Sequence, residues 1–493
     1  MRIKKYLLSL FMAFICMQVS AKDYPVSLFN IYSDGVTLNT RSIQYAIDYI
    51  SAQGGGRLVF SVGRYLTGSI SLKSGVTLDL QEGAVLVGSL NPFDYEKKSW
   101  VALIFAYDQQ HIGITGKGIV DGQGQLIARG VIDVIGKGFM KDPLSNGRPE
   151  ATNRPVLINF HHCEDISISD ITLKNSSSWV EVYDHCKNLR IDHIHVDSKD
   201  YWNNDGMDLV DCEDVTVSNS FIDSDDDGIC LKSFDATHTS SNILVRDCII
   251  RSSANGIKFG TASHGVFTDI RFLHNTIYDT YRSAIALEAV DGGVIKNITV
   301  DSLEALHTGN VIFLRIGERV PGKIGRLEHV RLSHIKATIP ASKPDAGYPY
   351  EGPVEDGPRN VSPAIVISGL PGGDVSDISM DHLEISHPGG GDSLYAQVPL
   401  DALSGIPENP DHYPEFSMFK ELPAWGAFIR HARNIHLTDF RLQCQKADFR
   451  VPIVLDDVHG ASFQALEVAA PRQSRPVFSY RSDSVNVNNR PLQ

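Results

Sequence analysis

The sequence predicts an all-β fold, a single-stranded right-handed parallel β-helix, from three observations. A unit of the form aliphatic-x-aliphatic-x-polar-x-x-aliphatic recurs along the chain, with early steps of 23, 26, 28, 27 and 28 residues. Each unit holds a pair of short strands and a polar corner, which is typical of stacked repeats. Residues 57–88 alternate aliphatic and polar side chains in short runs broken by Gly and Ser, as strands do. The units begin at Ile166, Leu189, Val215, Ile243, Ile270, Ile298, Val330, Ile378 and Ile435.

A leucine-rich horseshoe is the alternative solenoid, but it needs a fixed frame of Leu and Asn that this sequence lacks. Length alone suggests about three domains at roughly 150 residues each. That estimate does not apply to a solenoid, because each repeat contacts only its neighbours. We therefore expect one β-helix domain over residues 22–493.

The first 21 residues have the pattern of a signal peptide. Basic residues within the first five positions precede an apolar run over residues 6–19, and small residues follow at Ser20 and Ala21. No later stretch approaches the ~20 consecutive apolar residues of a membrane span. The sequence therefore predicts an exported protein, periplasmic or secreted, with no membrane span.

A short helix is expected over residues 40–53, directly before the first strands. Ile43, Ala46, Ile47 and Ile50 place apolar side chains on one face of such a helix. An amphipathic helix at this point would cap the end of the solenoid, which would otherwise expose a sheet edge.

Two long late loops are expected to leave the solenoid. The repeat lengthens to 48 residues after Val330 and to 57 after Ile378. The extra residues fall in Pro340–Gly373 and Gly389–Trp425, which are rich in Pro and Gly or in aromatics. Loops of this length are usually functional or disordered. We expect them to fold over one side of the groove and help to form the substrate site; a surface insertion without function is the alternative.

The balance of charges and cysteines excludes some classes of protein. A formal net charge of −14 argues against a nucleic-acid partner, because no basic stripe is present to neutralise phosphates. Cys163, Cys186 and Cys212 each stand three residues before an aliphatic strand residue, so they repeat one position on successive turns. We favour a stack of buried free thiols there over disulfides. No Cys or His pair has zinc spacing, and we expect no metal and no cofactor.

Two clusters of polar residues with carboxylates lie within residues 201–233. The first is Asn203-Asn204-Asp205 and the second is Asp225-Asp226-Asp227, on either side of a strand-like run. Asp205 and Asp226 stand 21 residues apart, about one coil, so they should lie on neighbouring turns roughly 4.7–4.9 Å apart. Carboxyl groups so close raise the pKa of some and leave that of others low, which provides an acid and a base together.

These motifs resemble glycoside hydrolase family 28, the polygalacturonase and rhamnogalacturonan hydrolase family, in the order NxD and then DD 21 residues later on a β-helical repeat. The stretches His111–Gly124 and Val156–Val182 are similar as well, so the resemblance covers about residues 54–301. It implies inverting hydrolysis in which Asp226 protonates the glycosidic oxygen while Asp205 and Asp227 activate a water. Inversion needs roughly 6.5–9.5 Å between acid and base to leave room for that water.

The sequence departs from the polygalacturonases of that family at two later motifs. Where they carry GHG and RIK, this chain has Ala254-Asn255-Gly256 and Ala286-Leu287-Glu288. Asn255 therefore replaces the His, and Ala286 and Glu288 replace the Arg and Lys. The rhamnogalacturonan-active branch of the family is similar in departing at these positions, which favours it over a plain endo-polygalacturonase.

Five further residues are candidates for substrate binding. Lys232 and Lys258 follow the carboxylate clusters and could hold a uronate carboxylate as point charges. Asn203, Asn255 and Glu288 could bond sugar hydroxyls. For the lysines and Glu288, a solvated surface position is the alternative.

Together the sequence predicts a metal-independent inverting glycoside hydrolase acting on a pectic, galacturonic-acid-containing polysaccharide or oligosaccharide. We favour exo action on galacturonic-acid or rhamnogalacturonan-type linkages, because the late loops could close one end of the groove. A calcium-dependent pectate-type lyase is an alternative, since such enzymes also combine β-helices with Asp clusters. A non-catalytic carbohydrate-binding solenoid is another, although it has no need for adjacent carboxylates that repel one another. We expect a monomer.

Overall fold

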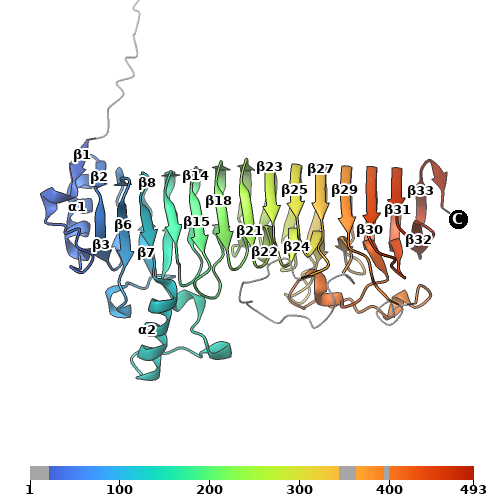
Figure 1. Cartoon of the computed structure of the whole chain (residues 1–493), viewed down its shortest axis with the longest axis horizontal. Coiled ribbons are helices and arrows are strands. Elements are labelled where there is room, and N and C mark those ends of the chain that lie inside the picture. Colours follow the sequence, from blue (N-terminus) through green and yellow to red (C-terminus); the bar gives the residue numbers. More distant parts are fainter. Residues whose placement is uncertain (1–21, 343–361, 393–398, 473, 493) are drawn as a thin grey trace, which may run out of the picture.

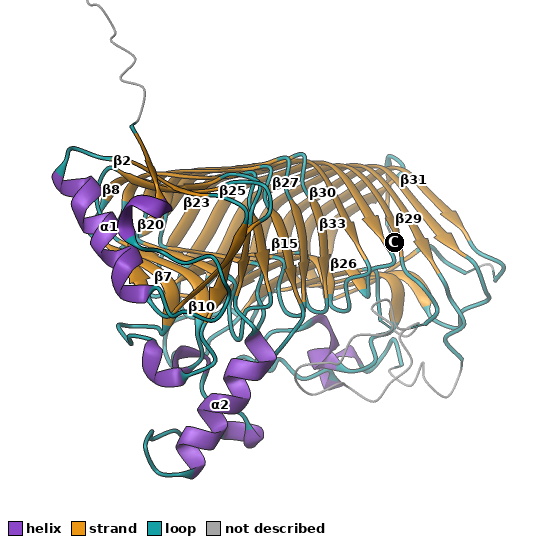
Figure 2. Cartoon of the chain, turned by 60° about the vertical axis from the view of Figure 1, so that its left-hand side comes forward, coloured by secondary structure: helices purple, strands orange, loops and turns teal. Residues whose placement is uncertain are grey.

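The computed structural model describes residues 22–342, 362–392, 399–472 and 474–492. These residues form one elongated solenoid of parallel strands, with the C-terminus at the end opposite the N-terminal helix (Figure 1). Figure 2 shows the strands stacked in flat layers around a common interior. The predicted right-handed parallel β-helix is confirmed. The predicted signal peptide over residues 1–21 lies outside the described residues.

Three stacks of strands run the length of the solenoid, and two long strands at its C-terminal end continue them. The first stack holds β1 (Asp23–Pro25), β2 (Gly56–Phe60), β5 (Val76–Leu80), β8 (Gln110–Thr115), β11 (Glu164–Ser169), β14 (Lys187–Asp192), β17 (Glu213–Ser218), β20 (Thr239–Arg246) and β33 (Asp483–Val487). The second holds β3 (Gly63–Thr67), β6 (Ala84–Gly88), β9 (Ile119–Asp121), β12 (Thr172–Lys174), β15 (His195–Ser198), β18 (Phe221–Ser224) and β21 (Ile249–Ser252). Strands β23 (Val266–Tyr278), β25 (Val294–Leu306), β27 (Arg326–Thr338) and β29 (Val375–His387) bend through both stacks.

The third stack is the one that carries the site. It holds β4 (Ile70–Ser71), β7 (Ala102–Tyr107), β10 (Val156–His161), β13 (Glu181–Asp184), β16 (Met207–Val210), β19 (Ile229–Ser233), β22 (Ile257–Ser263), β24 (Ser283–Ala289), β26 (Asn310–Ile316), β28 (Ile365–Ser368) and β32 (Val477–Tyr480). Strands β30 (Ala424–Cys444) and β31 (Val451–Ala469) begin in this stack and continue through the others, and β34 (Arg490–Pro491) pairs antiparallel with β33.

The predicted repeat sets the register of the first stack. All nine repeat-starting residues pair in one continuous ladder from Ile166 to Ile435. Each is buried, because alternate side chains of a strand point to the same side and here that side is the interior. The sequence predicted a pair of strands per turn, whereas each turn has a third strand. That strand lies on the third stack, where polar residues interrupt the aliphatic pattern.

Polar residues form the corners between strands, as the repeat predicted. Asp165, Asn188, Asp214 and Asn242 occupy one corner on successive turns, each with φ between 52° and 56°. Asn, Asp and His adopt this left-handed conformation more readily than other side chains. Asn242 also donates a hydrogen bond to Asp214 on the preceding turn (2.7 Å), so the corner residues stabilise one another.

Helix α1 (Thr40–Ala52) confirms the predicted cap. Ile43, Ala46, Ile47 and Ile50 are fully buried. The helix lies over the first strands at the N-terminal end of the solenoid (Figure 1). Among the described residues, no helix has the length and hydropathy needed to cross a bilayer.

A second helix, α2 (Gly124–Gly136), was not predicted. It belongs to an insertion between β9 and β10 that projects from the solenoid (Figures 1 and 2). Short 3-10 helices follow it, η3 (Ser145–Gly147) and η4 (Ala151–Asn153); η1 (Val26–Phe29) and η2 (Pro92–Asp94) precede it. The late loop before β30 holds η6 (Leu403–Gly405) and η7 (Phe416–Phe419), and it projects from the same side as α2 (Figure 1).

The cysteines agree with the predicted thiol stack. The six cysteines of the described residues are free and buried. Cys186 donates a hydrogen bond to the carbonyl of Phe160, and Cys212 to that of Tyr183, one turn away in each case. The thiols of Cys163, Cys186 and Cys212 therefore fill one corner of the interior on successive turns.

Candidate active site

The site is built where three turns enter the third stack. Asp205, Asp227 and Asn255 occupy the same position on consecutive turns, directly before β16, β19 and β22. Each is followed by a glycine, and the N–H of each glycine bonds to the carbonyl of the corresponding corner residue on the next turn, at 2.8–3.0 Å. Glycine is required there, because a Cβ on Gly206 would lie 2.5 Å from a methyl group of Ile222. The predicted juxtaposition of the two carboxylate clusters is present.

Lys232 neutralises the first carboxylates. Its Nζ lies 3.0 Å from Asp205 and 2.5 Å from Asp208, which projects from β16 beside Asp205. The ring of Trp179 covers the same ammonium group, with its centroid 4.3 Å from Nζ. Burial, together with the charges of Asp208, Asp226 and Asp227, raises the pKa of Asp205 although Lys232 opposes the shift. Lys232 is thus an internal cation of the site and not a surface side chain.

Lys258 has the same relation to the second cluster. Its Nζ lies 3.0 Å from Asp227 and 4.0 Å from Glu288, and it donates a 3.0 Å hydrogen bond to the hydroxyl of Tyr413. Asn255 donates a 2.8 Å hydrogen bond from Nδ2 to Asp227. Burial opposes ionisation, but Lys258, Lys232, Arg282 and the bond from Asn255 lower the pKa of Asp227 to about 2.

Asp226 differs from the adjacent Asp227 in its exposure and in the direction of its pKa shift. It is partly exposed, whereas Asp205, Asp208 and Asp227 are buried. Burial of its carboxyl group and the charge of Asp227 raise the pKa of Asp226, in spite of Arg282 and the two lysines. Two adjacent carboxyl groups therefore have pKa values displaced in opposite directions, and the one that holds its proton more strongly is the partly exposed one.

Glu288 is buried at the edge of this cluster. It is 1% exposed, and burial raises its pKa to about 8, so it is largely protonated at neutral pH. The expected surface alternative for Glu288, and for the two lysines, is therefore wrong. Glu288 is a buried, largely neutral carboxyl group 4.0 Å from the ammonium group of Lys258.

The insertion that contains α2 lies beside the carboxylate cluster. Arg154 is buried and donates hydrogen bonds to the carbonyl of Ser177 (2.5 Å) and to Oδ1 of Asn203 (2.6 Å). This bond holds Asn203, which has a φ of 58°, in the turn before Asp205. Arg148 lies over the ring of Trp202, 4.7 Å from its centroid, and interacts electrostatically with Asp226. Arg148 therefore brings a guanidinium group to the edge of the carboxylate cluster.

The late loop, expected over Gly389–Trp425, contacts the cluster through Tyr413 and Glu415; its residues 393–398 lie outside the described residues. Glu415 pairs with Arg282 at 2.8 Å, and Tyr413 contacts Lys258. Phe416 and Phe419 pack on Phe313 in an apolar cluster on the outer side of the third stack. Most of the other predicted loop, residues 343–361 of Pro340–Gly373, lies outside the described residues.

The structure thus brings together all eight residues singled out from the sequence and adds others. Asp208, Arg148, Arg282, Tyr413 and Glu415 were missed. Asp208 had a signal, because it alternates with the buried Met207 and Leu209 and must face outwards. The others come from an insertion, a corner and a loop, where no periodic pattern indicates direction.

Asp205, Asp227 and Cys230 offer ligand atoms within 4.8 Å of one another, as a metal site would. However, Lys232 Nζ lies 2.9 Å from Cys230 Sγ and 3.0 Å from Asp205, and Lys258 lies 3.0 Å from Asp227. The two ammonium groups supply the positive charge that a cation would supply. The residues present fit a metal poorly.

A parallel β-helix by itself does not determine a function, whereas a pair of carboxyl groups at one site is the feature that glycoside hydrolases share. The sequence profile of the glycosyl hydrolases family 28 matches residues 57–290. This match confirms the resemblance noted in the sequence.

Similar proteins agree with this match. A probable polygalacturonase of Vitis vinifera is 27% identical over 341 residues, which cover 64% of this chain and 61% of the relative. An exo-poly-alpha-D-galacturonosidase of Dickeya chrysanthemi is 27% identical over 41% of each chain. The chain thus spans less than two thirds of the length of either relative. The structure of the family 28 exopolygalacturonase of Yersinia enterocolitica shares the fold, with a TM-score of 0.63 and 19% identity over 96% of this chain and 79% of that one.

Proposed function

We propose that this chain is an inverting glycoside hydrolase that cleaves galacturonic-acid-containing chains, with Asp226 as the general acid. The observation that carries the proposal is the opposite displacement of two adjacent pKa values, that of Asp226 upwards and that of Asp227 to about 2. Such a pair provides a protonated acid and an ionised carboxylate at the same pH.

In the proposed reaction, Asp226 gives its proton to the glycosidic oxygen as the bond from that oxygen to the anomeric carbon breaks. A water attacks the anomeric carbon from the opposite face, and Asp227 takes the proton that this water loses. Asp205 lies on the turn before Asp227 and forms an ion pair with Lys232. We propose that Asp205 orients the same water. One water is consumed, and the configuration at the anomeric carbon inverts.

The charges around the cluster favour an acidic sugar. Arg148 and Arg282 both interact electrostatically with Asp226, so a uronate bound at the acid would lie near two guanidinium groups. A guanidinium group binds a carboxylate through two parallel hydrogen bonds. The relatives named as polygalacturonases and exo-galacturonosidases support a galacturonate in that position.

Exo action is the finer part of the proposal. Tyr413 contacts Lys258, and Glu415 pairs with Arg282, where the charged side chains of the third stack end. We infer that the late loop limits the substrate site on that side. A substrate site closed at one end accepts the end of a chain. Rhamnogalacturonan-type linkages are the alternative substrate, because Asn255, Ala286 and Glu288 replace the polygalacturonase motifs.

The test compares the wild type with Asp226→Asn on polygalacturonate, rhamnogalacturonan and their short oligomers, with chelator present. We expect wild type to release monosaccharide or disaccharide of inverted configuration, seen by NMR. The variant should remain folded and lose at least about two orders of magnitude in rate. Asp214→Asn, at an exposed corner, is the matched control. Activity that requires Ca²⁺ and yields unsaturated ends would instead establish a lyase.

Two further expectations concern the cell and the assembly. We propose that the protein acts after export, where pectic chains are found, and that it is a monomer. Fractionation of expressing cells and sedimentation of the purified chain test these two statements.

A further inference from the structure

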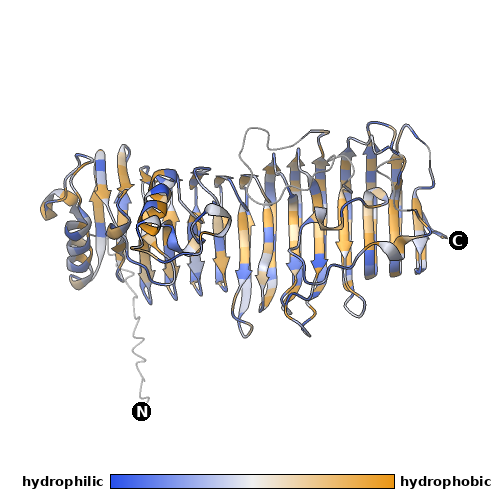
Figure 3. Ribbon diagram, turned by 90° about the horizontal axis from the view of Figure 1, so that it is seen from below, coloured by the Kyte–Doolittle hydropathy of each residue, from blue (hydrophilic) through white to orange (hydrophobic). Residues whose placement is uncertain are grey.

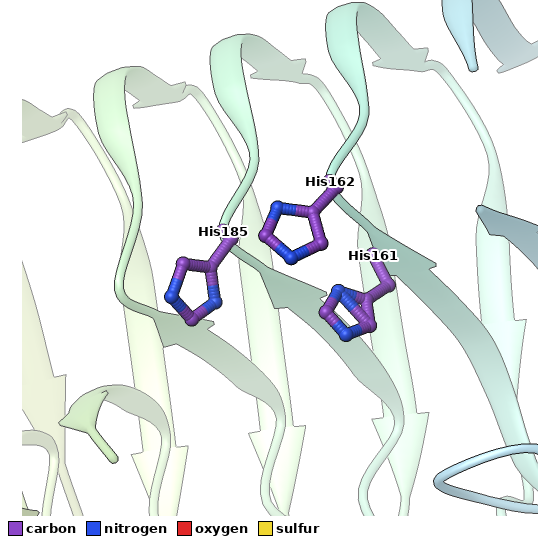
Figure 4. Close-up of side chains that lie close together, drawn as sticks. All are labelled: His161, His162 and His185. Carbon is purple, nitrogen blue, oxygen red and sulfur yellow. The ribbon is translucent and has the colours of Figure 1, made fainter. Parts of the chain in front are cut away.

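Four imidazole groups converge at a corner of the third stack, outside the carboxylate cluster. His161 is the last residue of β10, His162 follows it, and His185 is the equivalent of His162 on the next turn (Figure 4). His238 comes from the segment between β19 and β20, and its ring lies 5.0 Å from that of His185. In register, His161 is three strand steps from Lys232, or roughly 14 Å.

The solenoid explains only part of this arrangement. His162 and His185 have φ values of 50° and 51°, and histidine is common at such corners throughout this chain. Their stacking on successive turns is therefore expected. His161 and His238 do not occupy that corner, yet both rings turn towards it. Nδ1 of His161 and Nε2 of His238 are buried and have no hydrogen-bond partner.

Asp184 fixes the orientation of one of these rings. Its Oδ1 lies 2.6 Å from Nδ1 of His185, so that nitrogen carries the proton and donates it. With Nδ1 bound to Asp184, Nε2 is the nitrogen of His185 left to bind an ion, and it lies 3.6 Å from Asp235. A carboxylate that orients an imidazole in this way is the usual outer partner of a metal-binding histidine.

The charge around the cluster favours a cation. The ion pairs of His161, His185 and His238 within the described residues are all with carboxylates: Asp184, Asp235 and Glu213. This differs from the carboxylate cluster at Asp205 and Asp227, where Lys232 and Lys258 already supply the positive charge.

We propose that His161, His162 and His185 bind a divalent transition-metal ion such as Zn²⁺, with Asp184 as the carboxylate that orients His185. Their ligand atoms lie within 4.8 Å of one another. Two nitrogens at roughly 2.1 Å from a tetrahedral zinc ion lie about 3.4 Å apart. The rings must therefore move closer together on binding, and His162 is exposed and able to turn. Imidazole ligands suit Zn²⁺, Cu²⁺ and Ni²⁺, and three of them leave a position for water.

The experiment titrates the metal-stripped full-length protein with Zn²⁺ by calorimetry and with Co²⁺ by visible absorption. We expect one equivalent to bind, with cobalt bands of nitrogen ligation and no sulfur-to-metal charge-transfer band. The double variant His162→Asn/His185→Asn should weaken binding at least about 100-fold, and Asp184→Asn about 10- to 100-fold. Asparagine tolerates the corner conformation, so these variants should fold.

The matched control is His334→Asn/His382→Asn, which removes a stacked pair of corner histidines 5.0 Å apart on later turns. It should bind Zn²⁺ and Co²⁺ as the wild type does. The proposal is overturned if the wild type binds neither ion, if the control loses as much affinity as the first double variant, or if a sulfur band places the ion at Cys230. Because the cobalt spectrum of the wild type reports the ligands directly, a variant that fails to fold leaves the test decisive.

Discussion

The outer side of the third stack has two halves that differ in the side chains at one repeated position. On β16, β19 and β22 this position holds Asp208, Cys230 and Lys258; from β24 onwards it holds Ala286, Phe313, Val366, Phe428 and Val454. The strands of both halves pair in parallel along this column. In the charged half the column holds buried polar groups of the candidate site. In the apolar half it packs against Leu403, Ile406, Phe416, Phe419 and Leu422 of the late loop (Figure 3 views this side). The side chains of one column therefore decide where a loop can dock and where a substrate can bind.

The largest effect should follow from removing charge in the charged half. Asp227→Asn takes away the carboxylate with a pKa of about 2 and leaves Lys258 without its closest ion-pair partner. We expect the hydrolysis rate to fall by about 10²–10⁴. Steady-state assays on polygalacturonate measure this, with Asp214→Asn as control. A variant with wild-type kcat would mean that the charged half is not catalytic.

In the apolar half, Phe416→Ala should release the loop. Phe416 is 4% exposed and packs on the apolar column, and its loss should cost about 3–5 kcal/mol of local stability. Hydrogen exchange over residues 399–423 should then rise and KM should increase, because Tyr413 and Glu415 are carried by this loop. Phe93→Ala, at an exposed position, should change neither. If protection in the loop persists, the apolar column does not hold it.

Glu288 lies at the border of the two halves and should make stability depend on pH. Burial raises its pKa to about 8 from an ordinary 4.5, so the folded state binds a proton that the unfolded state has lost between these values. Its contribution is complete below about pH 4.5 and is lost as pH rises through 8, at ~1.4 kcal/mol per unit of pKa shift. Glu288→Gln should flatten this decline in denaturant titrations from pH 5 to 9. An unchanged slope would assign the decline to another group.

The smallest effect is expected at the contact between the halves. Tyr413→Phe removes the hydroxyl that accepts the hydrogen bond from Lys258, which should cost about 0.5–1.5 kcal/mol. We expect a change in kcat/KM of several fold, with the loop still docked by Phe416. A change as large as that of Asp227→Asn would give Tyr413 a direct part in the reaction.

The fold could be predicted from the sequence because its cause is periodic. The aliphatic repeat from Ile166 to Ile435 fixes both the register and the interior, and the helix over residues 40–53 has a regular apolar face. The third strand of each turn was missed, because charged residues such as Asp208 and Lys232 break the alternation there. Those residues are charged because they form the candidate site, so the pattern fails where the function lies.

For the candidate site, sequence reasoning reached the residues that sit on consecutive turns. The juxtaposition of Asp205 with the Asp225–Asp227 cluster follows from the repeat length, whereas Asp227 and Asn255 were singled out through the resemblance to the family. Arg148 and Glu415 follow from neither, since each is placed by tertiary contacts of an insertion or loop with no period of its own. The direction of each pKa shift also depends on those contacts, because the identity of the nearest cation decides which carboxyl group keeps its proton.

The glycine column behind Asp205, Asp227 and Asn255 has a consequence for how such a protein can change over time. Asp205, Asp227 and Asn255 are less than thirty positions apart from one turn to the next, and the glycines that follow them bond to the adjacent turns. The assembly is therefore short-range in topology, and turns can be gained or lost at either end without altering the distances within it. A deletion between residues 206 and 254 has the opposite effect, because it shifts one turn of the solenoid against the next. Such a shift separates the side chains of Asp205, Asp227 and Asn255, which act only as neighbours.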